Sequence, residues 1–292
     1  MKKMICTAAC ATLLGVTGSG AATPGTAASP LAANQTGYPS SMLVIGHSGL
    51  TGFGSNPRHP FQDATANSWA TGTNPAVGSI YTRLLAINPA IKGRAMNFAR
   101  DGATLAEFAG QVGRAVGLKT RPPDFVIVDI GGNDMKCDGQ DESRFGTFRA
   151  DFAASLQKLA NGLPSARIFV VGQNANYDGF VKAMMHLSLA ARLTHASKGL
   201  CSIFAPQSAP SPGSVVPAHL SYVKKIMDGI DSQLAVACSE IPRCTYDGDA
   251  SRHLNGTAAD LTSRYDHLSI TGLAKVAALE WAAMVRMHVI PG

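Results

Sequence analysis

The segment DFVIVDIGGND, residues 124–134, predicts the central element of the fold. Residues Phe125 to Val128 form an uninterrupted apolar run, and Gly131 and Gly132 close it. A short apolar run bounded by glycine is typical of a strand that is buried on both faces. Because such strands belong to parallel sheets covered by helices, this stretch favours an α/β protein.

Similar patterns continue on both sides of this segment. Apolar runs predict further strands at residues 42–46, 94–99, 166–171 and 243–246. Helical periodicity predicts helices at residues 76–87, 105–116, 145–159, 180–196, 222–237 and 273–289. Strands that alternate with helices form βαβ units. The sequence therefore predicts a single α/β domain with a mostly parallel sheet of about five strands and helices on both faces.

Composition excludes several classes of protein. The chain has 292 residues, of which 46% are hydrophobic and 15% charged, so intrinsic disorder is excluded. The formal charge is +6, but the 25 Lys and Arg residues form no basic run, so we expect no nucleic-acid partner. No apolar stretch reaches the roughly 20 residues of a membrane span, so we expect no integral membrane association.

The N-terminus has the pattern of a signal peptide. Lys2 and Lys3 precede an apolar stretch over residues 4–16, and small residues follow up to Ala22. We predict a signal peptide at 1–22, a flexible mature N-terminus at 23–40 and the folded domain at 41–292. Cleavage would remove two lysines and leave a charge of +4. The expected location is secreted or periplasmic. A lipoprotein site at Cys10 is the alternative, but the apolar stretch before it is short.

Four cysteines remain in the predicted mature chain, and an exported chain with an even number favours two disulfides. Three pairings are possible. Cys238 and Cys244 are close in sequence with Pro242 between them, so we favour that pair and, by exclusion, Cys137 with Cys201. A zinc site is the rival interpretation, but the chain has no Cys-x-x-Cys spacing.

Four short segments carry residues suited to chemistry. Ser48 follows the first predicted strand, Gly102 the second and Asn133 the third, while His267 precedes the last predicted helix. The carboxyl ends of parallel strands meet at one edge of a sheet, where such proteins bind ligands. We therefore expect these four residues to lie together.

Together these residues fit ester hydrolysis. Ser48 would be the nucleophile, and His267 would take its proton and return it to the leaving alcohol. The amides of Ser48 and Gly102 and the side chain of Asn133 would form an oxyanion hole. This chemistry needs no metal or organic cofactor. The expected partner is a small-molecule or polymer-borne ester, and the pattern specifies no oligomeric state.

The same segments resemble the SGNH hydrolases, also called the GDSL esterase/lipase family, over roughly residues 42–288. The matching positions are Gly46 and Ser48, then Asn97 and Gly102, then Gly131, Asn133 and Asp134, and finally His267, Leu268, Ser269 and Gly272. The resemblance implies a three-layer α/β/α sandwich of flavodoxin-like form. It also implies ester hydrolysis through an acyl-enzyme.

Two positions depart from the family pattern. His47 stands where the family has Asp, and Arg264 stands three residues before His267, where the family has its catalytic Asp. Arginine accepts no hydrogen bond and so cannot orient a histidine in that way. Asp266 is the nearest substitute, Asp260 is the next, and a backbone carbonyl is a third possibility. We predict Asp266.

Other interpretations compete with an SGNH esterase. An α/β-hydrolase elbow needs a second glycine where this chain has Leu50, and a trypsin-like protease does not alternate strands with helices. His47 and Arg264 favour a catalytically impaired binding protein for a glycan or lipid ligand. Trp69 is predicted either to line a substrate cleft or to pack in the core.

Overall fold

The computed structural model describes residues 37–173, 176–195 and 199–292. The predicted signal peptide and residues 23–36 of the predicted flexible segment lie outside these ranges. Residues 37–40, also predicted to be flexible, are tied to the domain by hydrogen bonds. Tyr38 donates its hydroxyl proton to the carbonyl of Pro291, and the amide of Ser40 donates to Asp124.

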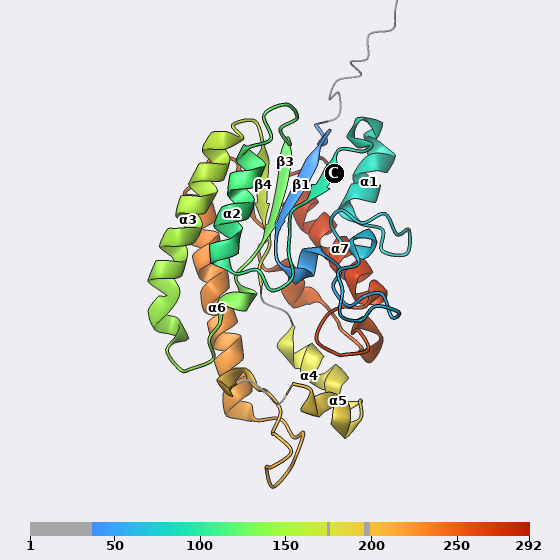
Figure 1. Cartoon of the computed structure of the whole chain (residues 1–292), viewed down its shortest axis with the longest axis vertical. Helices are drawn as coiled ribbons and strands as arrows, with labels where there is room; N and C mark the ends of the chain where they lie inside the picture. Colours follow the sequence, from blue (N-terminus) through green and yellow to red (C-terminus); the bar gives the residue numbers. More distant parts are fainter. Residues whose placement is uncertain (1–36, 174–175, 196–198) are drawn as a thin grey trace, which may run out of the picture. The chain divides into compact units, whose positions relative to one another are not determined.

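A parallel sheet of five strands forms the centre of the domain, as predicted (Figure 1). The strands are β1 (Met42–Gly46), β2 (Ala95–Asn97), β3 (Phe125–Asp129), β4 (Arg167–Val170) and β5 (Cys244–Tyr246). Their order is β2-β1-β3-β4-β5, and every adjacent pair is parallel. All residues of β1 and β3 are buried, because helices cover both faces.

Helices cover the two faces in separate layers (Figure 1). One layer contains α2 (Leu105–Val116), α3 (Phe145–Gly162) and α6 (Pro217–Ser239), and the other contains α1 (Ile80–Ile87) and α7 (Ile270–Arg286). Successive side chains of a strand point to opposite faces. Accordingly, Leu43 and Val126 pack in one hydrophobic cluster, and Val44 and Phe125 pack in the other. The predicted three-layer α/β/α sandwich is confirmed.

The predicted helix at 180–196 is wrong in detail. The structure has two shorter helices there, α4 (Tyr177–Met185) and α5 (Leu189–Leu193). Ser188 causes the break, because its side chain accepts a hydrogen bond from the amide of Ala191 and starts a new helix. Figure 1 shows both helices beyond the carboxyl ends of the strands.

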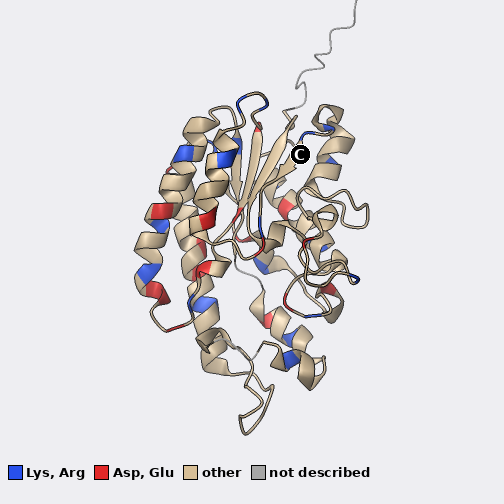
Figure 2. Ribbon diagram, in the orientation of Figure 1, with Lys and Arg blue, Asp and Glu red and all other residues tan. Residues whose placement is uncertain are grey.

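Two disulfides connect the elements as favoured from the sequence. Cys137 pairs with Cys201 and Cys238 pairs with Cys244. The first links the loop after β3 to the segment before α6, and the second links the end of α6 to β5. Both α2 and α3 carry side chains of both charge signs (Figure 2). In the described part of the chain, no helix is both long enough and apolar enough to cross a membrane.

Candidate active site

Ser48 lies in a tight turn at the carboxyl end of β1. It begins a short 3-10 helix, Ser48–Leu50, and only 8% of its surface is exposed. Gly46, just before the turn, has a φ of +146°, and a Cβ at this position would overlap the backbone carbonyl of Asp129 on β3. Glycine is therefore required where the chain leaves β1 so close to its neighbour.

His267 lies against Ser48 although 219 positions separate the two in the sequence. The distance from His267 Nε2 to Ser48 Oγ is 3.0 Å, which is a hydrogen-bond distance. Backbone pairing holds the segment in place, because the amide of Thr262 donates to the carbonyl of His267. Two residues later, the side chain of Ser269 caps α7. The fold thus brings together the predicted nucleophile and the predicted base.

Asp266 lies beside His267 without a well-directed hydrogen bond to it. Its Oδ1 is 3.3 Å from His267 Nδ1, an ion-pair distance, yet Nδ1 is buried and makes no hydrogen bond to a described residue. Arg264 holds the other carboxylate oxygen at 3.2 Å, and the Thr262 hydroxyl donates to Oδ1. Burial would raise the pKa of Asp266, but the His267 ring and the Arg264 guanidinium outweigh it and bring that pKa to about 2.

Asp260, the second candidate from the sequence, has other partners. Its carboxylate is 2.6 Å from Lys275 Nζ, and the same oxygen accepts hydrogen bonds from the amide and hydroxyl of Thr257. No hydrogen bond or ion pair links Asp260 to His267 in the described residues.

The three predicted oxyanion donors are placed differently. Asn133 lines the same cavity as Ser48, and one of its amide hydrogens is donated to the carbonyl of Ala103 at 3.0 Å, leaving the other available. The backbone amides of Ser48 and Gly102 make no hydrogen bond to another described residue. Gly102 lies in an exposed turn with a φ of +69°, and it is not among the residues that line the cavity.

Asn97 fastens the turn that carries Ser48. Its side-chain amide donates to the carbonyl of Leu50 at 2.9 Å and to the hydroxyl of Thr71 at 3.1 Å, and its oxygen accepts from the amide of Ala99. The sequence pattern offered Asn97 only as a marker of spacing. In the structure it ties the end of the Ser48–Leu50 turn to the loop that leads to Gly102.

His47 joins a partly buried polar network beside Ser48, and the members of this network line the same cavity. Its Nδ1 accepts a hydrogen bond from the amide of Gly49 at 3.0 Å, so its proton lies on Nε2. That Nε2 lies 2.6 Å from Gln173 Oε1 and 3.1 Å from Asp129 Oδ1. The Gln173 amide donates to the same Asp129 oxygen at 2.5 Å. Neither Gln173 nor Asp129 was predicted from the sequence, where the only signal is a polar residue at or just after the end of a buried strand.

His47 and Asp129 shift the pKa values of one another in this network. Burial would lower the pKa of His47, but the charge of Asp129 and the hydrogen bonds with Asp129 and Gln173 outweigh it and raise that pKa. Burial would raise the pKa of Asp129, but His47 and Gln173 outweigh it and lower that pKa. The pair therefore keeps a carboxylate stable under the turn of Ser48.

A cavity of about 400 Å³ opens beside Ser48, and we call it the serine cavity. Its walls include Ser48, Asn133, His267, Trp69 and Val276. Trp69 lines this cavity and packs in the core, with only 2% of its surface exposed, so the predicted packing role is confirmed. A nucleophile, a base and amide donors at one apolar cavity are the groups that acyl transfer requires.

Comparison with known proteins identifies a family and supports the fold. The sequence model described as GDSL-like Lipase/Acylhydrolase matches residues 42–192, just over half of the chain. An extracellular lipase from Streptomyces rimosus has a TM-score of 0.51 at 14% identity, covering 83% of this chain and 99% of that one. A phospholipase A1 from Streptomyces albidoflavus NA297 has a TM-score of 0.50 at 14% identity, covering 83% and 98%. No curated protein matches the chain in sequence. At these identities the structural likeness concerns the fold alone.

Proposed function

The chain belongs to the GDSL-like lipase/acylhydrolase family, and we propose that it is an exported serine esterase that hydrolyses carboxylic esters through an acyl-enzyme on Ser48. One observation carries most of this proposal. The 3.0 Å approach of His267 Nε2 to Ser48 Oγ joins a hydroxyl to a base at the wall of a cavity. This is the arrangement that activates a serine.

In the proposed reaction, Ser48 Oγ attacks the ester carbon while His267 Nε2 takes its proton. The tetrahedral intermediate then expels the alcohol, to which His267 returns the proton, and the acyl group stays on Ser48. A water molecule, deprotonated by His267, next attacks the acyl carbon. Loss of the carboxylic acid regenerates Ser48.

The proposed oxyanion hole uses the amides of Ser48 and Gly102 and the side chain of Asn133. Backbone amides that have no partner in the described protein, together with the spare hydrogen of Asn133, support this assignment. Donors fixed in advance stabilise the developing negative charge without reorganisation, and loss of one typically lowers the rate by about 10²–10³.

We assign the orientation of His267 to Asp266. For Nε2 to accept the proton of Ser48, the ring must carry its hydrogen on Nδ1, and a buried N–H needs an acceptor. Asp266 is the described carboxylate at ion-pair distance from Nδ1. Its low pKa keeps it ionised at neutral pH, so it also stabilises the imidazolium that forms during the reaction.

Export is the second part of the proposal. The basic and apolar N-terminus supports it, and so do two disulfides, which persist in oxidising compartments. Mass spectrometry of the product secreted by an expressing cell tests this part. A mature chain that starts near residue 23 is expected, whereas a retained Met1 would contradict the proposal.

Replacement of Ser48 by alanine tests the catalytic part. Ser48→Ala should abolish hydrolysis of p-nitrophenyl acetate and labelling by an organophosphonate, with unchanged circular dichroism. Ser239→Ala is the control, because Ser239 is an exposed serine at the end of α6 that lines no cavity beside Ser48, and it should leave both readouts intact. Equal rates for the wild type and Ser48→Ala would refute the esterase and favour the impaired binding protein.

A further inference from the structure

A second cavity, of about 350 Å³, meets the serine cavity at His267. Its deeper wall is formed by Phe180, Ala183, Ile203, Val223 and Leu261, and we call it the histidine cavity. Both cavities are lined by Met135, Tyr177, Leu254, Asp266, His267 and Leu268. Only the serine cavity is lined by Ser48 and Asn133.

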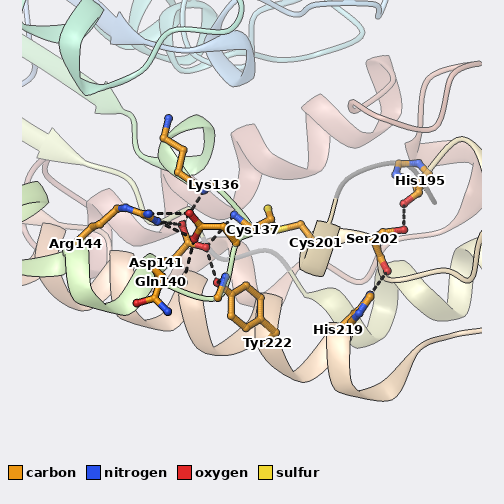
Figure 3. Close-up of a disulfide and its surroundings, with 12 residues drawn as sticks. Lys136, Cys137, Gln140, Asp141, Arg144, His195, Cys201, Ser202, His219 and Tyr222 are labelled. Atoms are coloured by element: carbon orange, nitrogen blue, oxygen red, sulfur yellow. Dashed lines mark hydrogen bonds and ion pairs between the residues drawn. A yellow bond between two sulfur atoms is a disulfide. The ribbon is translucent and has the colours of Figure 1, made fainter.

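The wall of the histidine cavity is firmly built. The disulfide of Cys137 and Cys201 ties one side of it to the loop after β3 (Figure 3). Next to this disulfide, the Ser202 hydroxyl donates to the carbonyls of His195 and Phe204, and the Ser202 carbonyl lies 2.8 Å from His219 Nδ1. A cavity with fixed walls is a preformed binding site, since little has to be ordered when a ligand enters.

Apolar side chains form much of this wall, among them Phe180, Ile203 and Leu261. Some of its polar groups are engaged within the protein: the Asn176 side chain accepts a hydrogen bond from the amide of Gly179, and one oxygen of Asp260 is paired with Lys275 and Thr257. Three buried atoms of the wall make no hydrogen bond to a described residue, and they are His195 Nε2, Asp260 Oδ1 and His267 Nδ1. Hydrocarbon that enters the cavity leaves water for the apolar side chains.

The chemistry of the proposed reaction decides which part of an ester each cavity takes. The acyl carbon is bonded to Ser48 and its oxygen faces Asn133, so the acyl group belongs in the serine cavity. The leaving oxygen receives its proton from His267 Nε2, so the alcohol must depart on the histidine side.

We propose that the histidine cavity binds the alcohol portion of the substrate and that the enzyme prefers esters of bulky hydrophobic alcohols. This proposal rests on the proposed function. A volume of about 350 Å³ lies at the lower end for small-molecule sites, which suits one or two hydrocarbon rings. The substrate class is then esters of cyclic or branched apolar alcohols, rather than acetylated polysaccharides.

A matched set of esters tests the assignment. In 2-cyclohexylethyl acetate the apolar body is on the alcohol, in ethyl 3-cyclohexylpropanoate it is on the acyl group, and ethyl acetate has neither. All three release primary alcohols of similar basicity, so binding dominates the comparison. We expect kcat/KM for 2-cyclohexylethyl acetate to exceed that for ethyl acetate by about tenfold or more, the scale of one or two buried methylenes.

Two variants fill one cavity each. Ala183→Leu narrows the histidine cavity and should reduce the preference for 2-cyclohexylethyl acetate by about tenfold, with little effect on the other two esters. Val276→Phe narrows the serine cavity and should instead impair ethyl 3-cyclohexylpropanoate. Circular dichroism and thermal unfolding verify that each variant is folded.

Product inhibition of the wild type gives a test without a variant. Free 2-cyclohexylethanol should inhibit ethyl acetate hydrolysis at a concentration at least about tenfold lower than the concentration of ethanol that gives the same inhibition, because it occupies the histidine cavity. Three results would each overturn the alcohol assignment without affecting the proposed esterase activity. These are equal inhibition by the two alcohols, no preference among the three esters, and a loss of activity on ethyl 3-cyclohexylpropanoate in Ala183→Leu. A wild type inactive on every ester would overturn the proposed function and this assignment with it.

Discussion

Replacing both Cys137 and Cys201 by serine should lower the free energy of unfolding by about 4 kcal/mol. The two cysteines are 64 positions apart, and closing a loop of that length restricts the unfolded chain by about this amount. The disulfide of Cys238 and Cys244 spans only 6 positions, so its removal should cost about 2 kcal/mol. The double variant Cys238→Ser/Cys244→Ser is therefore a matched control within the same chain.

The value for the Cys137–Cys201 disulfide assumes that the folded domain keeps its geometry when this disulfide is removed. Asp141, only 4% exposed, accepts hydrogen bonds from the amides of Lys136 and Cys137 and from the hydroxyl of Tyr222 (Figure 3). These bonds hold the loop after β3 independently of the sulfur atoms. The loss of stability should therefore arise mainly in the unfolded chain.

Urea unfolding followed by tryptophan fluorescence measures both values. The unfolded wild type is cross-linked, so each variant should also show a somewhat larger dependence on urea. A domain with a stability of about 5–15 kcal/mol survives either loss. Equal losses for the two variants, or a larger loss for the short loop, would refute the reasoning from loop length.

Three further predictions concern the site and the buried charges. Asp266→Asn should lower kcat by about tenfold to 10²-fold with little change in KM, because Asp266 Oδ1 and His267 Nδ1 are 3.3 Å apart without a directed hydrogen bond. This loss is smaller than the roughly 10⁴-fold loss that follows when a well-aligned catalytic aspartate is replaced by asparagine. Steady-state kinetics measures it, and an unchanged kcat would remove Asp266 from the mechanism. His47→Asp restores the residue of the family but breaks the pair with Asp129, so the free energy of unfolding in urea should fall by about 3 kcal/mol. Adding Asp129→Asn should restore part of this loss, whereas full stability of His47→Asp would contradict the pairing. Burial and the neighbouring Asp247 raise the pKa of Glu280 well above its ordinary value, so folding binds a proton there and the free energy of unfolding falls as the pH rises above about 4.3. Glu280→Gln should weaken that fall, and parallel curves of stability against pH for the wild type and the variant would exclude this role.

The centre of the sheet was predictable because β1 and β3 are buried on both faces. Each of these two strands is an apolar run that ends at a polar or glycine residue, and β1 over Met42–Gly46 agrees with its prediction to the residue. The edge strands β2 and β5 are only partly buried and only three residues long. The break between α4 and α5 was not predictable from periodicity. Apolar residues continue at helical spacing through this region, and only the local cap at Ser188 divides it.

Part of the site could likewise be predicted, for a topological reason. Parallel strands bring their carboxyl ends to one edge, so Ser48, Gly102, Asn133 and His267 were expected to meet. Ser48, Asn133 and His267 line one cavity, whereas Gly102 is not among the residues that line it. The same rule says nothing about side chains that support the turn from below. Asp129 and Gln173 act through contacts between β1, β3 and the chain after β4, and no spacing along a single segment encodes such contacts.

The two departures from the family pattern share one physical logic. At the first, the imidazole of His47 accepts the hydrogen bond of the Gly49 amide, and its second nitrogen needs an acceptor, which Gln173 and Asp129 supply. At the second, Arg264 occupies the position of the family's catalytic Asp and pairs with Asp266. The carboxylate beside His267 is therefore supplied by residue 266 instead of residue 264. In both places a change of residue type comes with a neighbour that balances its charge or hydrogen bonds. A buried polar group left without a partner costs about 1–3 kcal/mol, which applies to the shielded side chains of His47 and Asp129. The side chains of Arg264 and Asp266 are 38% and 31% exposed, so that pair contributes less to stability. This compensation serves the stability of the fold, which an active and an inactive protein need alike. Turnover by the wild type and its loss in Ser48→Ala therefore decide between the proposed esterase and the impaired binding protein.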